Sequence, residues 1–313
     1  FSRQFSAEPR RRILLETGTH SLWVARLLRS MGHEVCVLHA RSLKAITESR
    51  RKTDRLDARV LAQLGATTSV AVLHTVDVMD ESVQSDRAVL LARDLLVRCR
   101  TQQISHVRGV TKAWGVHVGS ATSKCFPVKV RERIPVPLLP ALAPVLESIL
   151  HLTEAIAAYD EQLKQLAEGR YAHSRLLTQV PGVGTLTALT YLWTIRDPNR
   201  FAKSRNVGAY VGLAPGSRAS GQRDPQLRIT KQGNPMLRRL LVQCAHHILA
   251  HPSCDGSLRS FGLRIAAQGG KRGKKRAVVA VARKLAVLLH HLWKTGEVYE
   301  PKLGAVTELK NAA

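Results

Sequence analysis

Aromatic and acidic residues are both scarce in this chain. Phe, Trp and Tyr make up only 4% of the 313 residues, which argues against an extended base-stacking surface of the kind that single-strand-binding proteins use. Asp and Glu number 23 against 48 Lys and Arg, which gives a formal net charge of +25. So large a basic excess predicts a polyanionic partner, and we expect the phosphate backbone of nucleic acid.

Clustered cysteines and long apolar runs are also missing. The five cysteines are scattered and form no Cys-x-x-Cys pair, so the sequence predicts free thiols in a reducing cytoplasm rather than a disulfide framework or a zinc site. No run of about 18 uncharged apolar residues occurs, and we expect no membrane partner. A hydrophobic content of 44% instead indicates globular domains with buried cores.

The first part of the chain has the pattern of a small α/β unit. Residues 12–15 predict a buried strand, the residues from Trp23 to Met31 a helix, and residues 34–39 a second strand. This order is typical of a βαβ unit with a parallel sheet. Functional groups of such sheets gather at the carboxyl ends of the strands, which is where Glu16 falls.

Helical patterns dominate the rest of the chain. Apolar spacing predicts long helices over residues 80–114 and 138–166, which pair as an antiparallel hairpin or coiled-coil arm; dimer contacts and ordinary core packing both explain such an arm. A Pro-Gly-x-Gly turn at 181–184 opens an apolar helix in the pattern of a helix-hairpin-helix motif, although short glycine turns also merely connect helices. A cationic run at 271–276 precedes a predicted helix over 277–293.

Two aspartates three residues apart, Asp54 and Asp57, lie in a strongly basic stretch and have two interpretations. In the first, Asp54 caps a helix over residues 56–64 and Asp57 supports its first turn. In the second, both face one side of that helix and hold one or two Mg²⁺ or Mn²⁺ ions together with Glu16. The cations nearby, Lys52 and Arg55 among them, favour the second interpretation because they would draw a polyanion to the acids.

A Gly- and Ser-rich stretch with several cations follows at residues 211–233. Serine is common in turns, so Ser217 and Ser220 need no special explanation. A serine nucleophile, however, needs a cationic surround that stabilises a pentavalent phosphate. Cations of this kind are present at Arg218, Arg223, Arg228 and Lys231. From its spacing alone, the stretch predicts a phosphate-binding loop.

Four motifs in this order resemble the DEDD transposases of bacterial insertion sequences, a family that includes Piv-type DNA invertases and bridge-RNA-guided recombinases. The motifs are Leu-Glu-Thr-Gly at 15–18, Lys-Thr-Asp-Arg-Leu-Asp-Ala-Arg at 52–59, Val-Pro-Gly-Val-Gly at 180–184, and Gly-Leu-Ala-Pro at 212–215 continuing through Ser220 to Lys-Gln-Gly-Asn at 231–234. The resemblance extends over most of the chain.

The resemblance implies a RuvC-like, RNase H-type α/β domain, a helical coiled-coil arm and a helical carboxyl-terminal transposase domain, which we place at residues 1–75, 76–172 and 173–313. It implies that Glu16, Asp54 and Asp57 are three of four metal-binding acids, and that Ser220 attacks DNA to form a phosphoserine link. Contacts to nucleic acid are expected from Lys52, Arg55, Gly182, Gly184, Arg218, Arg223, Arg228, Lys231, Lys271, Arg272, Lys274 and Lys275.

The expected partners and cofactor follow from the same resemblance. They are double-stranded DNA, a structured guide RNA and Mg²⁺ or Mn²⁺, with the protein acting as a homodimer or tetramer in the bacterial cytoplasm at the nucleoid. Two rival functions remain open at this point. One is a RuvC-like structure-specific nuclease that uses water and needs no Ser220, and the other is an inactive nucleic-acid-binding remnant.

The first acid of the family pattern has no match in its expected place. It belongs on a strand upstream of Glu16, and the only acid before residue 12 is Glu8, in a polar stretch with a proline. We therefore expect a truncated or decayed catalytic domain that lacks its first strands. With three acids in place of four, the chain is expected to recombine DNA weakly or not at all.

Overall fold

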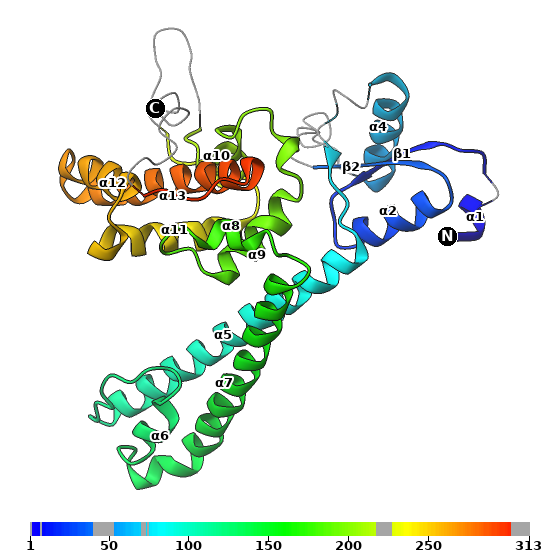
Figure 1. Ribbon diagram of the computed structural model, residues 1–313. Helices are drawn as coiled ribbons and strands as arrows, with labels where there is room; N and C mark the ends of the chain where they lie inside the picture. Colours follow the sequence, from blue (N-terminus) through cyan, green and yellow to red (C-terminus); the bar gives the residue numbers. More distant parts are fainter. Residues whose placement is uncertain are drawn as a thin grey trace. The chain divides into compact units, whose positions relative to one another are not determined.

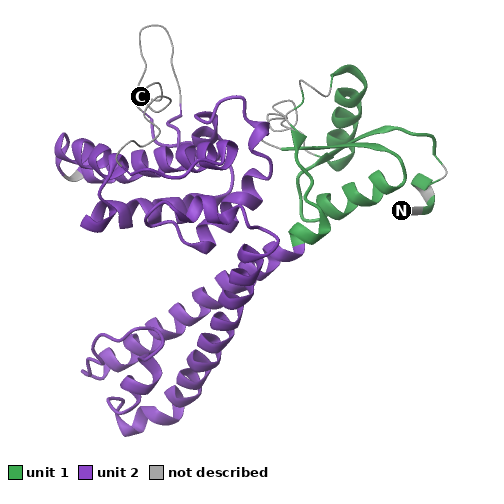
Figure 2. Ribbon diagram, viewed as in Figure 1, with its two compact units in different colours: residues 1–84 green, residues 85–313 purple. Residues whose placement is uncertain are grey.

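The computed structural model describes residues 2–6, 8–39, 53–69, 73, 75–216 and 227–301. The chain divides into two compact units, residues 1–84 and 85–313 (Figure 2). The first unit carries a small sheet with flanking helices, and the second is helical (Figure 1). The expected arm and carboxyl-terminal domain fall together in the second unit.

The first unit is built on the parallel βαβ arrangement that the sequence predicts. β1 (Arg12–Glu16) and β2 (Glu34–Leu38) pair in parallel, with Glu16 opposite Leu38, and α2 (Ser21–Ser30) connects them. A two-residue strand, β3 (Thr75–Val76), adds antiparallel to β2 and gives the sheet order β1-β2-β3. The short helix α1 (Ser2–Ser6) precedes the sheet. The sequence did not predict β3, because two residues are too few to show a strand period.

Alternate residues of the two parallel strands feed two apolar clusters on opposite faces of the sheet. On one face, Val35 and Val37 pack with Ala25 and Leu28 of α2. On the other face, Leu14, Cys36 and Leu38 pack with apolar residues of α4 (Asp54–Thr67), namely Val60, Leu61 and Leu64. The sheet is therefore covered by one helix on each side, as expected for strands with continuous apolar sequence.

Two long helices, α5 (Glu81–Ala113) and α7 (Leu139–Glu168), form the arm (Figure 1). Side-chain hydrogen bonds show that the two helices run antiparallel, because later residues of α5 contact earlier residues of α7. Arg93 pairs with Asp160, Arg100 with Thr153, and Gln103 with Ser148. The tip is closed by α6 (Phe126–Arg131) and the 3₁₀ turn η2 (Val136–Leu138), around a cluster centred on Phe126.

By length and composition alone, the helical stretch Val136–Glu168 is apolar enough to cross a membrane, which the sequence reading did not anticipate. Part of this apolar character is used inside the arm, where Leu142, Leu146 and Ile149 are buried in the tip cluster. Most residues in its most apolar part are not buried, however. The arm therefore keeps apolar surface that its own hairpin does not cover.

The remaining helices of the second unit pack around α13 (Gly270–Thr295). They are α8 (Ser174–Thr178), α9 (Thr185–Ile195), η3 (Pro198–Arg200), α10 (Asn206–Tyr210), α11 (Pro235–Ala250), η4 (Pro252–Cys254) and α12 (Ser257–Ala267). The hydroxyl group of the fully buried Tyr191 donates to the Ala286 carbonyl oxygen at 2.7 Å, which ties α9 to α13. Burial also raises the pKa of Tyr191, so its hydroxyl stays neutral and keeps this bond.

Two sequence-based expectations for this part of the chain are wrong. The cationic run at 271–276 does not precede the last helix but forms its first turns, since α13 begins at Gly270. The adjacent pair His290-His291 predicts histidines at the surface or facing a phosphate, but His290 is fully buried and contacts the Pro198 carbonyl oxygen at 2.8 Å and the Ser204 hydroxyl at 3.0 Å. Its neighbouring apolar residues and the two contacts explain the burial of an imidazole there.

Candidate functional site

The three acids singled out from the sequence all lie in the first unit. Glu16 ends β1 and is exposed, while Asp54 and Asp57 lie in the first turn of α4, exposed and half-buried respectively. The helix is capped by Thr53, whose hydroxyl oxygen accepts the Leu56 N–H at 3.3 Å. The interpretation of Asp54 as the cap is therefore wrong. Both aspartates are left to interact with the helix dipole or with an external ligand.

The described acids do not form a complete metal site on their own. The second half of α4 packs against β1. A Cβ added to Gly65 would lie only 2.9 Å from the Leu14 side chain, and the Gly65 carbonyl oxygen accepts a hydrogen bond from Arg12 at 3.3 Å. Among the described residues, no group of three His, Cys, Asp or Glu side chains is placed to hold a metal ion. Carboxylates are the right donors for Mg²⁺. A site built on these three would need at least one more ligand.

The glycine turn of the second unit joins two helices, as the sequence predicts. Residues 179–184 join α8 to α9, and Gly182 adopts a positive φ of +86° with His247 close behind it. Gly184 is the exposed N-cap of α9, and the first helical bond runs from Ala188 N–H to its carbonyl oxygen. The N–H groups of the first turn therefore have no partner within the helix itself, and such groups can bind an anion.

The ends of the serine-containing loop are held together by main-chain hydrogen bonds. We call residues 212–216 and 227–233 the stem, because Gly216 N–H donates to the Arg228 carbonyl oxygen, Thr230 N–H to that of Ala214, and Lys231 N–H to that of Gly212. Pro215 and Ile229 form an antiparallel bridge between the two halves. Ser217, Arg218, Ser220 and Arg223 lie between these halves, outside the described residues.

Two glycines allow the halves of the stem to approach closely. Gly212 has a φ of +73° and lies against the backbone of Gln232, so a Cβ there would overlap the Gln232 carbonyl oxygen. Gly233, with a φ of +71°, lies in the same way against the Tyr210 carbonyl oxygen. Only glycine combines a positive φ with so close an approach of two backbones. The Gly-Leu-Ala-Pro and Lys-Gln-Gly-Asn motifs are therefore two halves of one packed structure.

Helix α11 supports the stem from its first turns. The Asn234 side-chain oxygen accepts the Met236 and Leu237 N–H groups, so the predicted N-cap is confirmed. One turn later, Arg238 donates to the carbonyl oxygens of Val211 at 3.1 Å and Gln232 at 2.7 Å, one beside each half of the stem. Burial lowers the pKa of this guanidinium, but an arginine stays charged and strengthens both bonds.

The next residue of α11 makes a different connection. Arg239 forms an ion pair with Asp94 of α5, and Asp94 also pairs with Arg98. Successive helix residues point about 100° apart, so Arg238 and Arg239 reach different neighbours from the same turn. α11 is thus bonded both to the stem and to the base of the arm. The sequence did not single out either arginine, because their partners lie far away in the chain.

The described cations of the predicted nucleic-acid surface are exposed. Arg228 and Lys231 belong to the stem, Arg55 lies on α4, and Arg272, Lys274 and Lys275 lie on the first turns of α13. Lys52 and the side chain of Lys271 are outside the described residues. Cations at the amino-terminal end of a helix oppose its dipole, which favours a negatively charged partner there. Backbone contacts to such a partner explain the run better than helix stability does.

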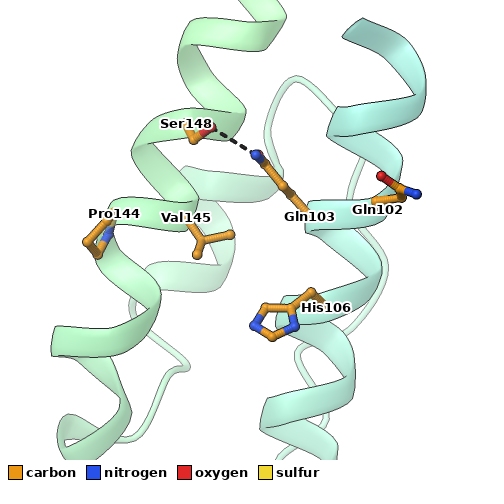
Figure 3. A pocket seen from close by; sticks show the side chains of 6 residues that line it. All are labelled: Gln102, Gln103, His106, Pro144, Val145 and Ser148. Carbon is orange, nitrogen blue, oxygen red and sulfur yellow. Dashed lines mark hydrogen bonds between the residues drawn. The ribbon is translucent and has the colours of Figure 1, made fainter. Parts of the chain in front are cut away.

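A pocket between α5 and α7 lies apart from all of these residues (Figure 3). It has a volume of about 380 Å³ and is crossed by the hydrogen bond from Gln103 to Ser148. It is lined by Gln102, Gln103, His106, Pro144, Val145 and Ser148. None of these side chains is a carboxylate or a strong cation. We therefore place no chemistry in this pocket.

The α/β unit with exposed acids and the exposed cations of α13 are consistent with a protein that handles DNA. Comparison with protein families agrees. Residues 174–259 match the model described as the transposase IS116/IS110/IS902 family, and residues 4–113 match a second transposase model of the DEDD type.

Individual relatives also identify the family to which the chain belongs. It is 31% identical, over 88% of its own length and 75% of the relative's, to the transposase for insertion sequence element IS1111A of Coxiella burnetii. It is 30% identical to the putative transposase y4pF/y4sB of Sinorhizobium fredii, over 96% and 77% of the two lengths. The match to the transposase for IS1328 of Yersinia enterocolitica is 29% over 74% and 69%. The chain belongs to the IS110-type transposase family and is a DNA transposase that acts for an insertion sequence.

Proposed function

We propose that the chain cuts and rejoins DNA during transposition with Ser220 as its nucleophile. The observation that carries the proposal is the stem, whose main-chain hydrogen bonds and paired glycines fix both ends of the ten residues that contain Ser220. A covalent mechanism needs a nucleophile that returns to the same place for the second step. The stem holds the two ends of this segment in place, together with what we call the Arg238 clasp, the two hydrogen bonds from Arg238 to the Val211 and Gln232 carbonyl oxygens.

The chemistry is a double exchange of phosphate ester bonds. The Ser220 oxygen forms a bond to phosphorus and loses its proton to solvent, while the deoxyribose oxygen leaves and gains a proton. In the second step, a deoxyribose hydroxyl of another strand attacks the phosphoserine and releases the serine. The exposed cations Arg228 and Lys231, beside the stem, would stabilise the pentavalent phosphate in both steps.

The proposed metal is Mg²⁺ or Mn²⁺ held by Glu16, Asp54 and Asp57. A bound metal of this type supplies a Lewis acid for phosphoryl transfer. The carboxylate donors and the parallel βαβ unit support a RuvC-like domain. Among the described residues no three acids are gathered for a metal, so the proposal requires that bound DNA and metal draw Glu16 and the two aspartates together.

The proposed partners are double-stranded DNA, a structured guide RNA and a second copy of the chain, at the nucleoid. The net charge of +25 suits more than one polyanion. The arm offers exposed apolar side chains at Leu91, Leu95 and Leu150, and we propose that they contact a second arm in a homodimer or tetramer.

The experiment that tests the serine proposal is capture of a covalent protein–DNA adduct. Wild-type chain and the Ser217→Ala variant are expected to give an adduct that survives denaturing electrophoresis, and Ser220→Ala none. Ser217 is a matched control because it lies three residues away in the same loop. Adduct formation by Ser220→Ala but not by Ser217→Ala would contradict the assignment. Cleavage without any adduct would instead indicate a nuclease that uses water, and binding without cleavage an inactive remnant.

A further inference from the structure

An exposed tryptophan lies in the first turn of α2, shortly after Glu16 in the chain. Trp23 is 48% exposed although its helix neighbours Leu22, Val24 and Ala25 pack against the sheet. Single exposed apolar residues are common on protein surfaces and need no function by themselves. Trp23 is different because a hydrogen bond from its indole N–H holds the ring in one orientation.

The indole N–H of Trp23 donates to His20 Nδ1 at 3.1 Å. The two rings meet edge to face, with centroids 6.2 Å apart and planes at 86°. Because Nδ1 accepts this bond, neutral His20 carries its proton on Nε2, where it is a hydrogen-bond donor. The pair therefore presents an aromatic surface and, beside it, one N–H group.

The turn that carries the pair is itself held in place. Thr17 N–H donates to the Leu38 carbonyl oxygen at 2.9 Å, which joins the end of β1 to the end of β2. The Ser21 hydroxyl donates to the Gly18 carbonyl oxygen at 2.8 Å and closes the turn. Trp23 and His20 thus sit on a rigid turn at the carboxyl end of β1. In open α/β sheets, ligands bind at this edge.

We propose that Trp23 stacks on an unpaired base of a DNA strand held at the carboxyl end of β1, and that His20 Nε2 donates to a neighbouring phosphate oxygen. Every base has a π-face, so a single ring gives stacking energy without choosing a sequence. A transposase must hold strands that are locally unpaired while they are exchanged. The proposal requires DNA binding by this chain but neither serine chemistry nor a metal ion.

The test measures binding of a fluorescently labelled single-stranded DNA oligonucleotide to the full chain, without divalent metal. We expect Trp23→Ala to weaken binding by about 5- to 150-fold, the range for loss of one stacked base, and Trp23→Phe to keep most of the affinity. Trp114→Ala is the matched control, because Trp114 is 54% exposed but lies at the end of α5. Unchanged binding by Trp23→Ala would overturn the proposal.

Tryptophan fluorescence gives a second readout, in which Trp23 itself reports on bound DNA and only conservative Phe replacements are needed. In a Trp114→Phe background, saturating single-stranded DNA is expected to quench an exposed tryptophan signal that Trp23→Phe removes. A fully paired duplex of the same sequence should give little quenching. Equal quenching by the duplex would overturn base stacking, and quenching by single-stranded RNA alone would overturn the assignment to DNA.

A protein contact at the same surface would have a different signature. Trp23→Ala could instead change the oligomeric state of the protein in solution while DNA binding stays the same. The ring would then belong to a subunit interface, and the proposal would fail. Ser220→Ala is expected to bind and quench like the wild type. Failure of the serine proposal would therefore leave this measurement unaffected.

Discussion

Backbone geometry at Gly212 gives a sharp expectation at the scale of one residue. Its positive φ and its contact with the Gln232 backbone leave no room for a Cβ. We expect Gly212→Ala to destabilise the second unit by at least about 2 kcal/mol, from backbone strain and a forced separation of the stem. Thermal unfolding measures this.

Gly184 is the matched control for that substitution. It has a φ of −94°, and no heavy atom lies within 4 Å of an added Cβ. Gly184→Ala should therefore cost only about 0.5–1 kcal/mol in stability, because alanine is a poorer N-cap than glycine but meets no steric overlap here. Equal destabilisation by the two substitutions would show that the close approach of the stem does not exist in solution.

The acid pair shows what residue patterns decide and what they leave open. Sequence spacing placed Asp57 in the first turn of a helix, and the structure confirms it, whereas Asp54 was assigned as the cap and lies in the first turn instead. The cap was assigned one residue too late because Thr and Asp both cap helices well and only the backbone geometry selects one of them. Whether Glu16 shares a metal with the aspartates depends on contacts between distant segments, which local spacing does not encode.

At the scale of elements, helix α11 bonds to two neighbours through adjacent arginines. Arg238→Met removes the donor shared by the Val211 and Gln232 carbonyl oxygens. We expect a loss of about 1–3 kcal/mol in stability. Hydrogen exchange at the stem amides of Gly216, Thr230 and Lys231 should become faster, and mass spectrometry of peptides that cover them measures it.

Arg239→Met is the control for Arg238→Met. It removes the ion pair with Asp94 but leaves every stem bond in place. Because this pair is partly exposed, we expect a stability change below about 1 kcal/mol and unchanged exchange at the stem. Faster stem exchange in Arg239→Met alone would show that the stem depends on the arm rather than on the Arg238 clasp.

Helices and strands whose apolar pattern repeats several times could be predicted from the sequence. Features that depend on distant residues could not. The apolar residues within an element were enough to predict β1, α2, β2, α5 and α7. The bounds of these elements agree with the sequence expectations to within a few residues. The start of α13 was missed because a glycine-flanked cationic run resembles a solvated loop. His290 was misplaced because its burial depends on Pro198 and Ser204, more than 80 residues earlier.

At the scale of the whole molecule, the net charge of +25 governs DNA affinity. We expect the logarithm of the binding constant for duplex DNA to fall linearly with the logarithm of salt concentration, as counterions are released from the phosphates. The double variant Lys274→Ala/Lys275→Ala should reduce the magnitude of the slope by about 1–2. Fluorescence anisotropy over a salt series measures the slope.

The tip of the arm provides a control of equal charge. Lys124 and Lys129 are exposed there, and their double replacement by Ala removes the same two charges from the chain. The slope of this variant should stay close to that of the wild type. If both double variants changed the slope equally, net charge rather than contact by α13 would explain the binding.

The stem also has a consequence for how this family can change. Because main-chain hydrogen bonds close it at Gly216 and Arg228, the pairing of the two halves does not require a particular side chain at either position. Doubling the length of a closed flexible segment costs only about 0.6 kcal/mol. Insertions and substitutions between the two halves should accordingly be tolerated by the fold. A peptide tag inserted between the two halves is therefore expected to leave the domain folded while it removes the chemistry proposed for Ser220.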